Sequence, residues 1–297
     1  MTGVQKFTLE NLLLGKETQL LIISRIPRLV SILVTGASLG IAGIIVQTIS
    51  SNKFVSPSTI GTMDWAKFGI MISLIFLGDK STLLKMTVAF IFALFGTMLF
   101  MKVLSKMKIK NVVMIPLIGI MLGNVVNSIT GFVAYKFDLI QSIGSWMQGN
   151  FALVVKGRYE LIYIGIPFFV LAYIYTDKFT IVGIGKNFSD NLGLNRDKIT
   201  FIGLIIVSVI TASIVVTIGT IPYVGLIIPN IVSIYKGDNM KKSLPDTAIL
   251  GALFVLICDI AGRIVMYPYE VSISVIMSIV GSLIFLILIF RRYKYAN

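Results

Sequence analysis

Residues 28–50 read RLVSILVTGASLGIAGIIVQTIS, and this stretch sets the class of fold. Beyond its first residue it holds no charge, and a helix of about 20 apolar residues is long enough to cross the hydrocarbon core of a bilayer. Gly36, Gly40, Gly43 and Gln47 recur at helical spacing, so they lie on one face of that helix. Small residues on one face let neighbouring transmembrane helices approach closely. The stretch therefore predicts a membrane-spanning helix that packs among others.

The composition of the whole chain agrees with a membrane protein. Of its 297 residues, 56% are hydrophobic and 13% are charged, against about 25% charged in soluble domains. The mean hydropathy is +0.94. A soluble enzyme, a nucleic-acid-binding domain and a disordered chain all need more charged surface, so these classes are excluded. We predict an all-α, polytopic membrane protein without a sizeable soluble domain.

Nine apolar runs predict helices that cross the membrane. They cover residues 28–50, 66–78, 83–103, 112–135, 160–176, 199–218, 222–235, 246–267 and 273–290. The run 222–235 is short and contains Pro229, so we expect a short or broken helix there, surrounded by protein. A tenth apolar piece, 139–153, is interrupted by glycine and asparagine and predicts a helix at the membrane surface.

Basic residues are distributed unevenly between the short gaps that separate these runs. Alternate gaps hold the larger group: Lys53, Lys102, Lys106, Lys108, Lys110, Lys178, Lys186, Arg196, Lys198, Lys236, Lys241, Lys242, Arg291, Arg292 and Lys294. The other gaps hold the smaller group: Arg25, Arg28, Lys80, Lys85, Lys136, Lys156 and Arg158. Cytoplasmic loops carry the excess of lysine and arginine. The C-terminus is therefore predicted to be cytoplasmic, with Arg25 and Arg28 on the outer side.

The same topology leaves the N-terminus outside, although residues 1–24 contain no signal peptide. We therefore interpret residues 1–24 as an extracellular N-terminal segment, truncated by the loss of a first span. Residues 25–297 are interpreted as the transmembrane domain.

Polar side chains lie on the small-residue faces of three predicted spans. Gln47 lies on the first span, Asn124 and Asn127 on the fourth, and Ser274 and Ser278 on the last. Close helix packing explains stripes of glycine and serine, but packing alone does not require amides. We interpret these five residues as candidates for lining a polar translocation path.

Two charge pairs lie within apolar runs, Asp259 with Arg263 and Asp64 with Lys67. A charge in the membrane interior costs at least about 2.5–3.5 kcal/mol, and pairing reduces this cost. Structural neutralisation inside the bundle explains both pairs. Arg263 also lies near the outer end of its helix, where it can reach an external partner.

The chain lacks the residues that catalysis and metal binding usually require. It has no histidine, and Cys258 is its one cysteine, so the usual general base and the usual ligands of transition metals are missing. A single cysteine also excludes a disulfide within the chain. The sequence contains no phosphate-binding loop and no nucleophile motif. We predict no enzyme activity, no metal and no cofactor.

The most specific motif is GTIPYVGLIIPN at residues 219–230, and shorter motifs accompany it. They are Arg25-Ile26-Pro27-Arg28, Asn191-Leu192-Gly193-Leu194, Gly237-Asp238, Leu244-Pro245, Gly251-Ala252, Asp259 and Arg263. In order and spacing, from Arg25 to the end, these motifs resemble FecCD-type permeases, the membrane subunits of type II ABC importers for iron–siderophore complexes, haem and vitamin B12. The chain is most similar to the siderophore permeases of Gram-positive bacteria.

The sequence departs from the family pattern at several positions. Lys53 stands where the family usually has proline, Asn230 replaces the usual histidine, and Glu270 lies where proline is common before the last span. Residues 62–65, TMDW, replace a stretch that is usually rich in small residues. The family has ten spans, and the span missing here is the first.

The resemblance implies a docking surface at the outer face. Arg25, Arg28 and Arg263 correspond to arginines that meet acidic residues of the substrate-binding protein. Exposed guanidinium groups suit this role because they orient a partner and speed its association. Anchoring to lipid headgroups is the alternative for Arg25 and Arg28.

The resemblance also implies two cytoplasmic elements. A coupling helix that contacts the ATPase corresponds to Asn187, Ser189, Asp190, Asn191, Leu192, Gly193 and Leu194. Ser189 or Asn187 is expected to cap this helix and Gly193 to end it, unless the segment is an ordinary loop. Asn52 and Phe54 correspond to a loop that closes the cytoplasmic mouth, for which a tight turn at a helix end is the alternative.

The resemblance thus implies a multi-pass permease of the bacterial plasma membrane that dimerises with itself or with a similar permease. Its expected partners are a cytoplasmic ABC ATPase dimer, an extracellular substrate-binding lipoprotein, membrane lipid and a ferric siderophore, with catecholates favoured and no nucleic acid. A permease for haem or a cobalamin is the alternative within the class. Outside the class, the alternatives are an ion-driven secondary transporter, in which Asp64 and Asp259 titrate, and a membrane scaffold, which explains neither the coupling loop nor the outward arginines.

Overall fold

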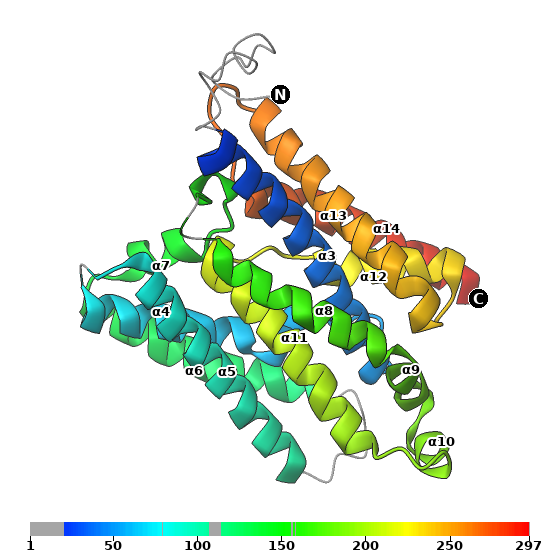
Figure 1. Ribbon diagram of the computed structural model, residues 1–297. Coiled ribbons are helices and arrows are strands. Elements are labelled where there is room, and N and C mark those ends of the chain that lie inside the picture. The colour runs from blue at the N-terminus through cyan, green and yellow to red at the C-terminus, as the bar shows by residue number, and fades with distance from the viewer. Residues whose placement is uncertain (1–20, 79, 107–113, 156, 158, 297) are drawn as a thin grey trace.

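The computed structural model is a bundle of helices (Figure 1). It describes residues 21–78, 80–106, 114–155, 157 and 159–296. The N-terminal segment up to residue 20, and Lys108, Lys110, Lys156 and Arg158 of the charge pattern, lie outside the described residues. Within these ranges the chain forms no β-strand beyond a single backbone bridge between Gln148 and Thr220, which confirms the all-α prediction.

The chain consists of long helices and a few short helical turns. The elements are η1 (Leu21–Arg25), α3 (Ile26–Ile49), η2 (Pro57–Ile60), α4 (Thr62–Leu77), α5 (Thr82–Lys106), α6 (Met114–Lys136), α7 (Ile140–Met147), η3 (Phe151–Leu153), η4 (Glu160–Ile164), α8 (Gly165–Ile174), α9 (Thr176–Ile184), α10 (Lys186–Asn191), α11 (Arg196–Ile218), α12 (Val224–Lys236), α13 (Met240–Ile264) and α14 (Ile273–Ala296).

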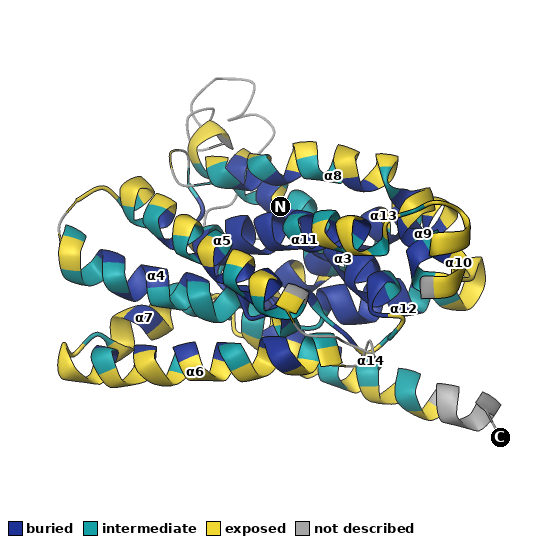
Figure 2. Cartoon of the chain, turned by 90° about the horizontal axis from the view of Figure 1, so that it is seen from below, coloured by how far each residue is buried: buried dark blue, intermediate teal, exposed yellow. Residues whose placement is uncertain are grey.

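Helix α3 lies in the centre of the bundle and is mostly buried, as is α11 (Figure 2). The glycine stripe of α3 allows close backbone contacts with α12 and α13. A Cβ atom on Gly36 would lie 2.3 Å from the carbonyl oxygen of Gly251 in α13, and a Cβ atom on Gly43 would lie 1.9 Å from the carbonyl oxygen of Gly225 in α12. Only glycine permits this approach, so the predicted packing role of the stripe is confirmed.

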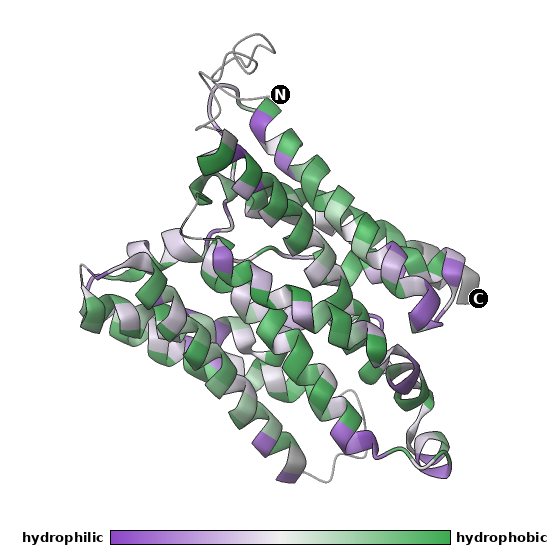
Figure 3. Cartoon of the chain, viewed as in Figure 1, coloured by the Kyte–Doolittle hydropathy of each residue, from purple (hydrophilic) through white to green (hydrophobic). Residues whose placement is uncertain are grey.

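The outer surface of the bundle is largely apolar (Figure 3). Exposed hydrophobic side chains include Met121, Phe132, Ile257, Ile279 and Phe290. An apolar exterior of this kind suits lipid, because the hydrocarbon core has no water to solvate polar groups. The structure therefore agrees with a multi-pass membrane protein.

The prediction of nine membrane-crossing helices, one of them short or broken, needs correction. Among the described residues, six helices are long and apolar enough to cross a membrane, or seven if the pair Glu160–Ile174 and Thr176–Ile184, bent by 60°, counts as one span. Helices α4 and α12 have 16 and 13 residues, fewer than a full crossing needs. The short helix expected for 222–235 is confirmed as α12, and the piece 139–153 is the short helix α7 followed by a turn, so it is not a span.

Helix α12 begins directly after a crossing of two non-helical segments. Gln148 bridges Thr220, the amide of Asn150 donates to the carbonyl of Ile218, and the amide of Thr220 donates to the carbonyl of Met147. The Ser274 hydroxyl donates to the Thr220 carbonyl at 2.6 Å. These bonds satisfy backbone groups that no helix pairs at this point of the chain.

The Gly43 contact generates a paired prediction. Gly43→Ala should lower the free energy of unfolding by at least about 2 kcal/mol, because its methyl group overlaps backbone atoms of α12 that cannot yield. Gly131→Ala in α6 makes the same chemical change where nothing lies within 4 Å of the added Cβ, and it should be neutral or stabilise by up to about 1 kcal/mol. Thermal unfolding of the purified variants measures both effects, and equal melting temperatures would contradict the packing argument.

Candidate functional site

Four charged side chains meet at the N-terminal end of α3. The Arg28 guanidinium donates from Nη2 to Asp259 Oδ1 at 2.9 Å and from Nη1 to Glu270 Oε2 at 2.7 Å. Arg263 donates from Nε and Nη2 to Asp259 Oδ2 at 3.0 and 2.7 Å. Two cations and two anions therefore alternate, and the cluster joins α3, the end of α13 and the loop that leads to α14.

The burial of this cluster corrects one expectation. The side chain of Asp259 is 5% exposed, and those of Arg28 and Arg263 are 12% and 14% exposed. Arg28 and Arg263 are therefore not the exposed guanidinium groups that the sequence analysis expected, because their internal ion pairs draw them into the bundle. Arg25, at the end of η1, is half-buried. The expected pairing of Asp259 with Arg263 is confirmed.

A second polar cluster holds the loop at the other end of α3. The Asn52 carboxamide oxygen accepts from the Phe54 amide at 2.9 Å, which makes a tight turn directly after the helix. Asn230 in α12 donates from Nδ2 to the Lys53 carbonyl at 2.8 Å, and the Lys53 ammonium pairs with Asp238. The exposed ring of Phe54 lies edge-on to Phe285 of α14, with centroids 6.1 Å apart.

The predicted coupling segment forms the short helix α10 and the turn after it. The amide of Leu194 donates to the Ser189 carbonyl, and the amide of Gly193 donates to the Asp190 carbonyl. Gly193 has a φ of +72°, so this is a Schellman ending and the predicted stop at Gly193 is confirmed.

The expected cap of this helix is wrong. The helix begins at Lys186 and its N-cap is Gly185, with no side-chain cap. Ser189 is instead buried inside the segment, whereas Asn187, Asp190, Asn191 and Leu192 are exposed. The polar face of α10 is thus available to a partner.

The five candidate path residues do not share one environment. Asn124 of α6 and Ser278 of α14 are exposed, and the two helices lie along the same flank of the bundle (Figure 2). Ser274 is partly buried in the crossing. Gln47 is 2% exposed and donates to the carbonyls of Gly225 and Leu226. Within this chain, Gln47 therefore fastens α3 to α12 and does not line an open surface.

The second predicted charge pair, Asp64 with Lys67, differs from the first. The ion pairs of the described residues include neither side chain. Lys67 donates to the Asn127 side-chain oxygen at 2.7 Å, and Asp64 packs against Gly123, also in α6. The TMDW departure at residues 62–65 thus brings polar groups to the contact between α4 and α6.

Sequence reasoning missed the pairing of two acidic residues. Glu270 pairs with Arg28 across a sequence separation of 242 residues, and Asp238 pairs with Lys53 across 185 residues. The departures from the family pattern at Glu270 and Lys53 were the available signals. Within the described ranges, no group of three acidic or cysteine side chains is placed to hold a metal ion.

Comparisons with known proteins agree with this arrangement of an apolar bundle with polar ends. The model of the FecCD transport family matches residues 2–291. The chain therefore belongs to the FecCD transport family, whose members are permease subunits of ABC importers, and a separate ATPase subunit hydrolyses ATP.

Individual relatives are similar over nearly the whole chain. The petrobactin import system permease protein YclN of Bacillus subtilis is 57% identical over 95% of this chain and 89% of its own length. The ferric-anguibactin transport system permease protein FatD of Vibrio anguillarum is 38% identical over 92% of this chain and 87% of its own length. A solved inward-facing structure of a metal-chelate type ABC transporter matches the fold with a TM-score of 0.84, at 23% identity over 97% of this chain and 91% of that one.

The charge cluster at the N-terminal end of α3 predicts a difference between its two carboxylates. Asp259→Asn should destabilise the protein by about 3–5 kcal/mol, because it leaves two largely buried guanidinium groups without their shared anion. Glu270→Gln should cost less than about 1 kcal/mol, because the Glu270 side chain is 30% exposed and water replaces the lost contact. Thermal unfolding of both variants tests the ranking, and a larger loss for Glu270→Gln would contradict it.

Proposed function

We propose that this chain is the membrane permease of an ABC importer for iron(III)–siderophore complexes, with catecholate-type chelates favoured. The observation that carries the proposal is its 57% identity to a petrobactin import permease over 95% of the chain. The similarity to a ferric-anguibactin permease supports the wider class of ferric siderophores. The permease works as a homodimer or a heterodimer with a similar permease in the plasma membrane, around a path between the two copies.

The outer end of α3 receives the substrate-binding lipoprotein in this proposal. Arg28 and Arg263 form ion pairs with Asp259 and Glu270 at one end of the bundle, and Arg25, at the end of η1, precedes Arg28 by three residues. An anionic partner surface is attracted there by the guanidinium groups, which fix its orientation. The lipoprotein brings the chelate and releases it into the path.

The opposite end couples the permease to the ATPase dimer. The exposed residues Asn187, Asp190, Asn191 and Leu192 of α10 and its turn form the contact, and Gly193 and Leu194 shape it. ATP binding and hydrolysis move α10, and the permease responds by shifting between outward-facing and inward-facing states. The basic residues near this end support its cytoplasmic location, together with that of the C-terminus.

The path runs along the flank that α6 and α14 share, past Asn124, Asn127, Ser274 and Ser278. At its cytoplasmic end the Phe54 ring, held against Phe285, forms an apolar gate. The Asn52 turn and the Asn230 contact to the Lys53 carbonyl fix the loop that carries this ring. A wide apolar gate blocks a bulky chelate without binding it tightly.

An ion-driven secondary transporter is less consistent with the charge geometry. Such a mechanism needs a carboxylate that gains and loses a proton or a sodium ion. Asp259, one of the two candidates, is bound by two guanidinium groups at 2.7–3.0 Å. Both carboxylate oxygens of Asp259 are therefore already occupied by arginines of the same chain.

Uptake measurements in the source bacterium test the substrate class. Deleting the gene for this chain should abolish uptake of a labelled ferric catecholate and leave uptake of a labelled ferric hydroxamate unchanged, because separate importers serve the two classes. Restoring the gene should restore catecholate uptake only while the ATPase partner is present. Loss of neither chelate would overturn the proposed substrate class, and uptake that persists without the ATPase would favour an ion-driven transporter.

The coupling contact has its own prediction. Leu192→Asp should lower uptake by more than about tenfold, because it places a charge in an interface with the ATPase. Leu192 is 55% exposed, so the substitution leaves the permease folded. Leu153→Asp, at a leucine that is 62% exposed in η3, is the matched control. Uptake that is equal in both variants would count against α10 as the ATPase contact.

A further inference from the structure

The Arg28 guanidinium lies between two carboxylates that differ in how firmly they are held. Asp259 is 5% exposed and accepts hydrogen bonds from both Arg28 and Arg263. Glu270 is 30% exposed and belongs to the loop between α13 and α14. Among the described residues, Arg28 is the one ion-pair partner of Glu270. Asp259 is thus a fixed component of the cluster, and Glu270 is an exchangeable one.

The Arg28–Glu270 contact determines whether the Arg28 guanidinium is available to bind a carboxylate of an external protein. Nη2 of Arg28 is directed by Asp259, which fixes the orientation of the guanidinium plane. Nη1 donates to the outermost carboxylate of the cluster, Glu270, at 2.7 Å. A partner that approaches from outside meets this contact first, and it finds Arg28 already neutralised.

We propose that Glu270 occupies the position of a partner's carboxylate, so that docking replaces the Arg28–Glu270 ion pair with an ion pair between Arg28 and an acidic residue of the docking protein. This inference rests on the proposed function, in which the outer face receives a substrate-binding lipoprotein. Glu270 then acts as an internal competitor that sets the strength of docking.

Competition of this kind also selects among partners. A partner with a carboxylate opposite Arg28 exchanges one ion pair for another and loses little. A partner without an acidic group at that position has two options, and both are unfavourable. Either Glu270 stays in place and its carboxylate faces the partner's surface, or the Arg28–Glu270 ion pair breaks and no new ion pair replaces it. Such unfavourable contacts discriminate as effectively as favourable ones do. Glu270 therefore makes the outer face specific for an acidic docking protein.

Direct binding measurements test the competition. The full-length permease, assembled with its ATPase subunits in lipid nanodiscs, is titrated with the soluble domain of the substrate-binding lipoprotein of the same transport system. Glu270→Gln should raise the affinity by about 3- to 10-fold, mainly through faster association, because the partner's carboxylate no longer competes for Arg28 and one repelling charge is gone. Unchanged or weaker binding would overturn the proposal, since a merely structural Glu270 predicts one of these results.

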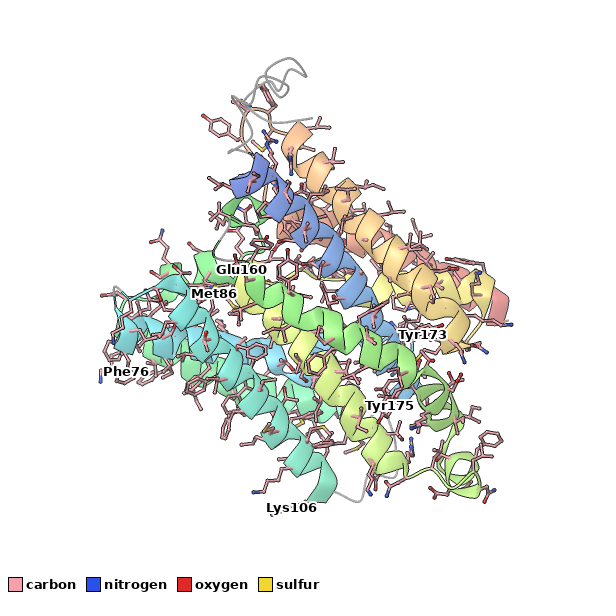
Figure 4. All side chains as sticks on the ribbon, viewed as in Figure 1. Phe76, Met86, Lys106, Glu160, Tyr173 and Tyr175 are labelled. Atoms are coloured by element: carbon pink, nitrogen blue, oxygen red, sulfur yellow. The ribbon has the colours of Figure 1, made fainter. Side chains whose placement is uncertain are left out.

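Glu160→Gln is the matched control. Glu160, in η4, lies near Met86 and away from Lys106 (Figure 4), and it is exposed. Its carboxylate accepts from the Gly157 amide, so its removal changes the net charge equally and leaves Arg28 untouched. If Glu160→Gln raised the affinity as much as Glu270→Gln does, the change in net charge alone would explain both effects. That result would overturn the proposed competition.

Arg25→Glu separates failure of this inference from failure of the docking assignment. If Arg25→Glu weakens binding and Glu270→Gln leaves it unchanged, the outer face still docks the lipoprotein and only the competition is wrong. If neither variant changes binding, the docking assignment falls and the inference falls with it. Melting temperatures of the variants exclude misfolding as the cause of any loss.

Discussion

The close approach of α3 to its neighbours is the constraint on which the rest of the structure depends. Gly36 meets Gly251 and Gly43 meets Gly225 at distances that leave no room for a Cβ atom. Backbone contacts of this kind fix the helices against one another more firmly than side-chain packing in lipid can, because lipid tails compete equally for apolar side chains. The helix therefore forms a rod whose middle is fixed against α12 and α13.

The two ends of this rod carry the two polar clusters of the molecule. At one end Arg28 joins Asp259 and Glu270, and at the other the Asn52–Phe54 loop is held by Asn230 and Asp238. The departures from the family pattern at Lys53, Asn230 and Glu270 all fall in these clusters. Each of them has a partner in its cluster, so these three substitutions alter how the two ends of α3 are held.

The sequence predicts the elements of the fold better than it predicts their partners. The apolar runs and glycine stripes identify the helices and the faces that pack, because periodicity is a local property. The lengths of α4 and α12 were less predictable, since α12 begins only after the crossing of residues 147–150 with 218–223 and α4 begins only after the turn η2 and Gly61. The contacts of Glu270 and Asp238 join residues far apart in the chain, and no local pattern encodes such a pairing. The burial of Arg28 and Gln47 was missed for the same reason, because a polar residue near a helix end looks exposed until its partners are known.

The account as a whole depends on the two polar clusters lying on opposite sides of the membrane. Labelling with a membrane-impermeant maleimide tests this directly in variants that carry one cysteine, in a Cys258→Ser background that removes the buried native thiol. Tyr269→Cys, beside Glu270, should be labelled in intact cells. Asn191→Cys, in α10, should be labelled only after the membrane is opened and the ATPase is removed. Labelling of Asn191→Cys in intact cells would contradict the account.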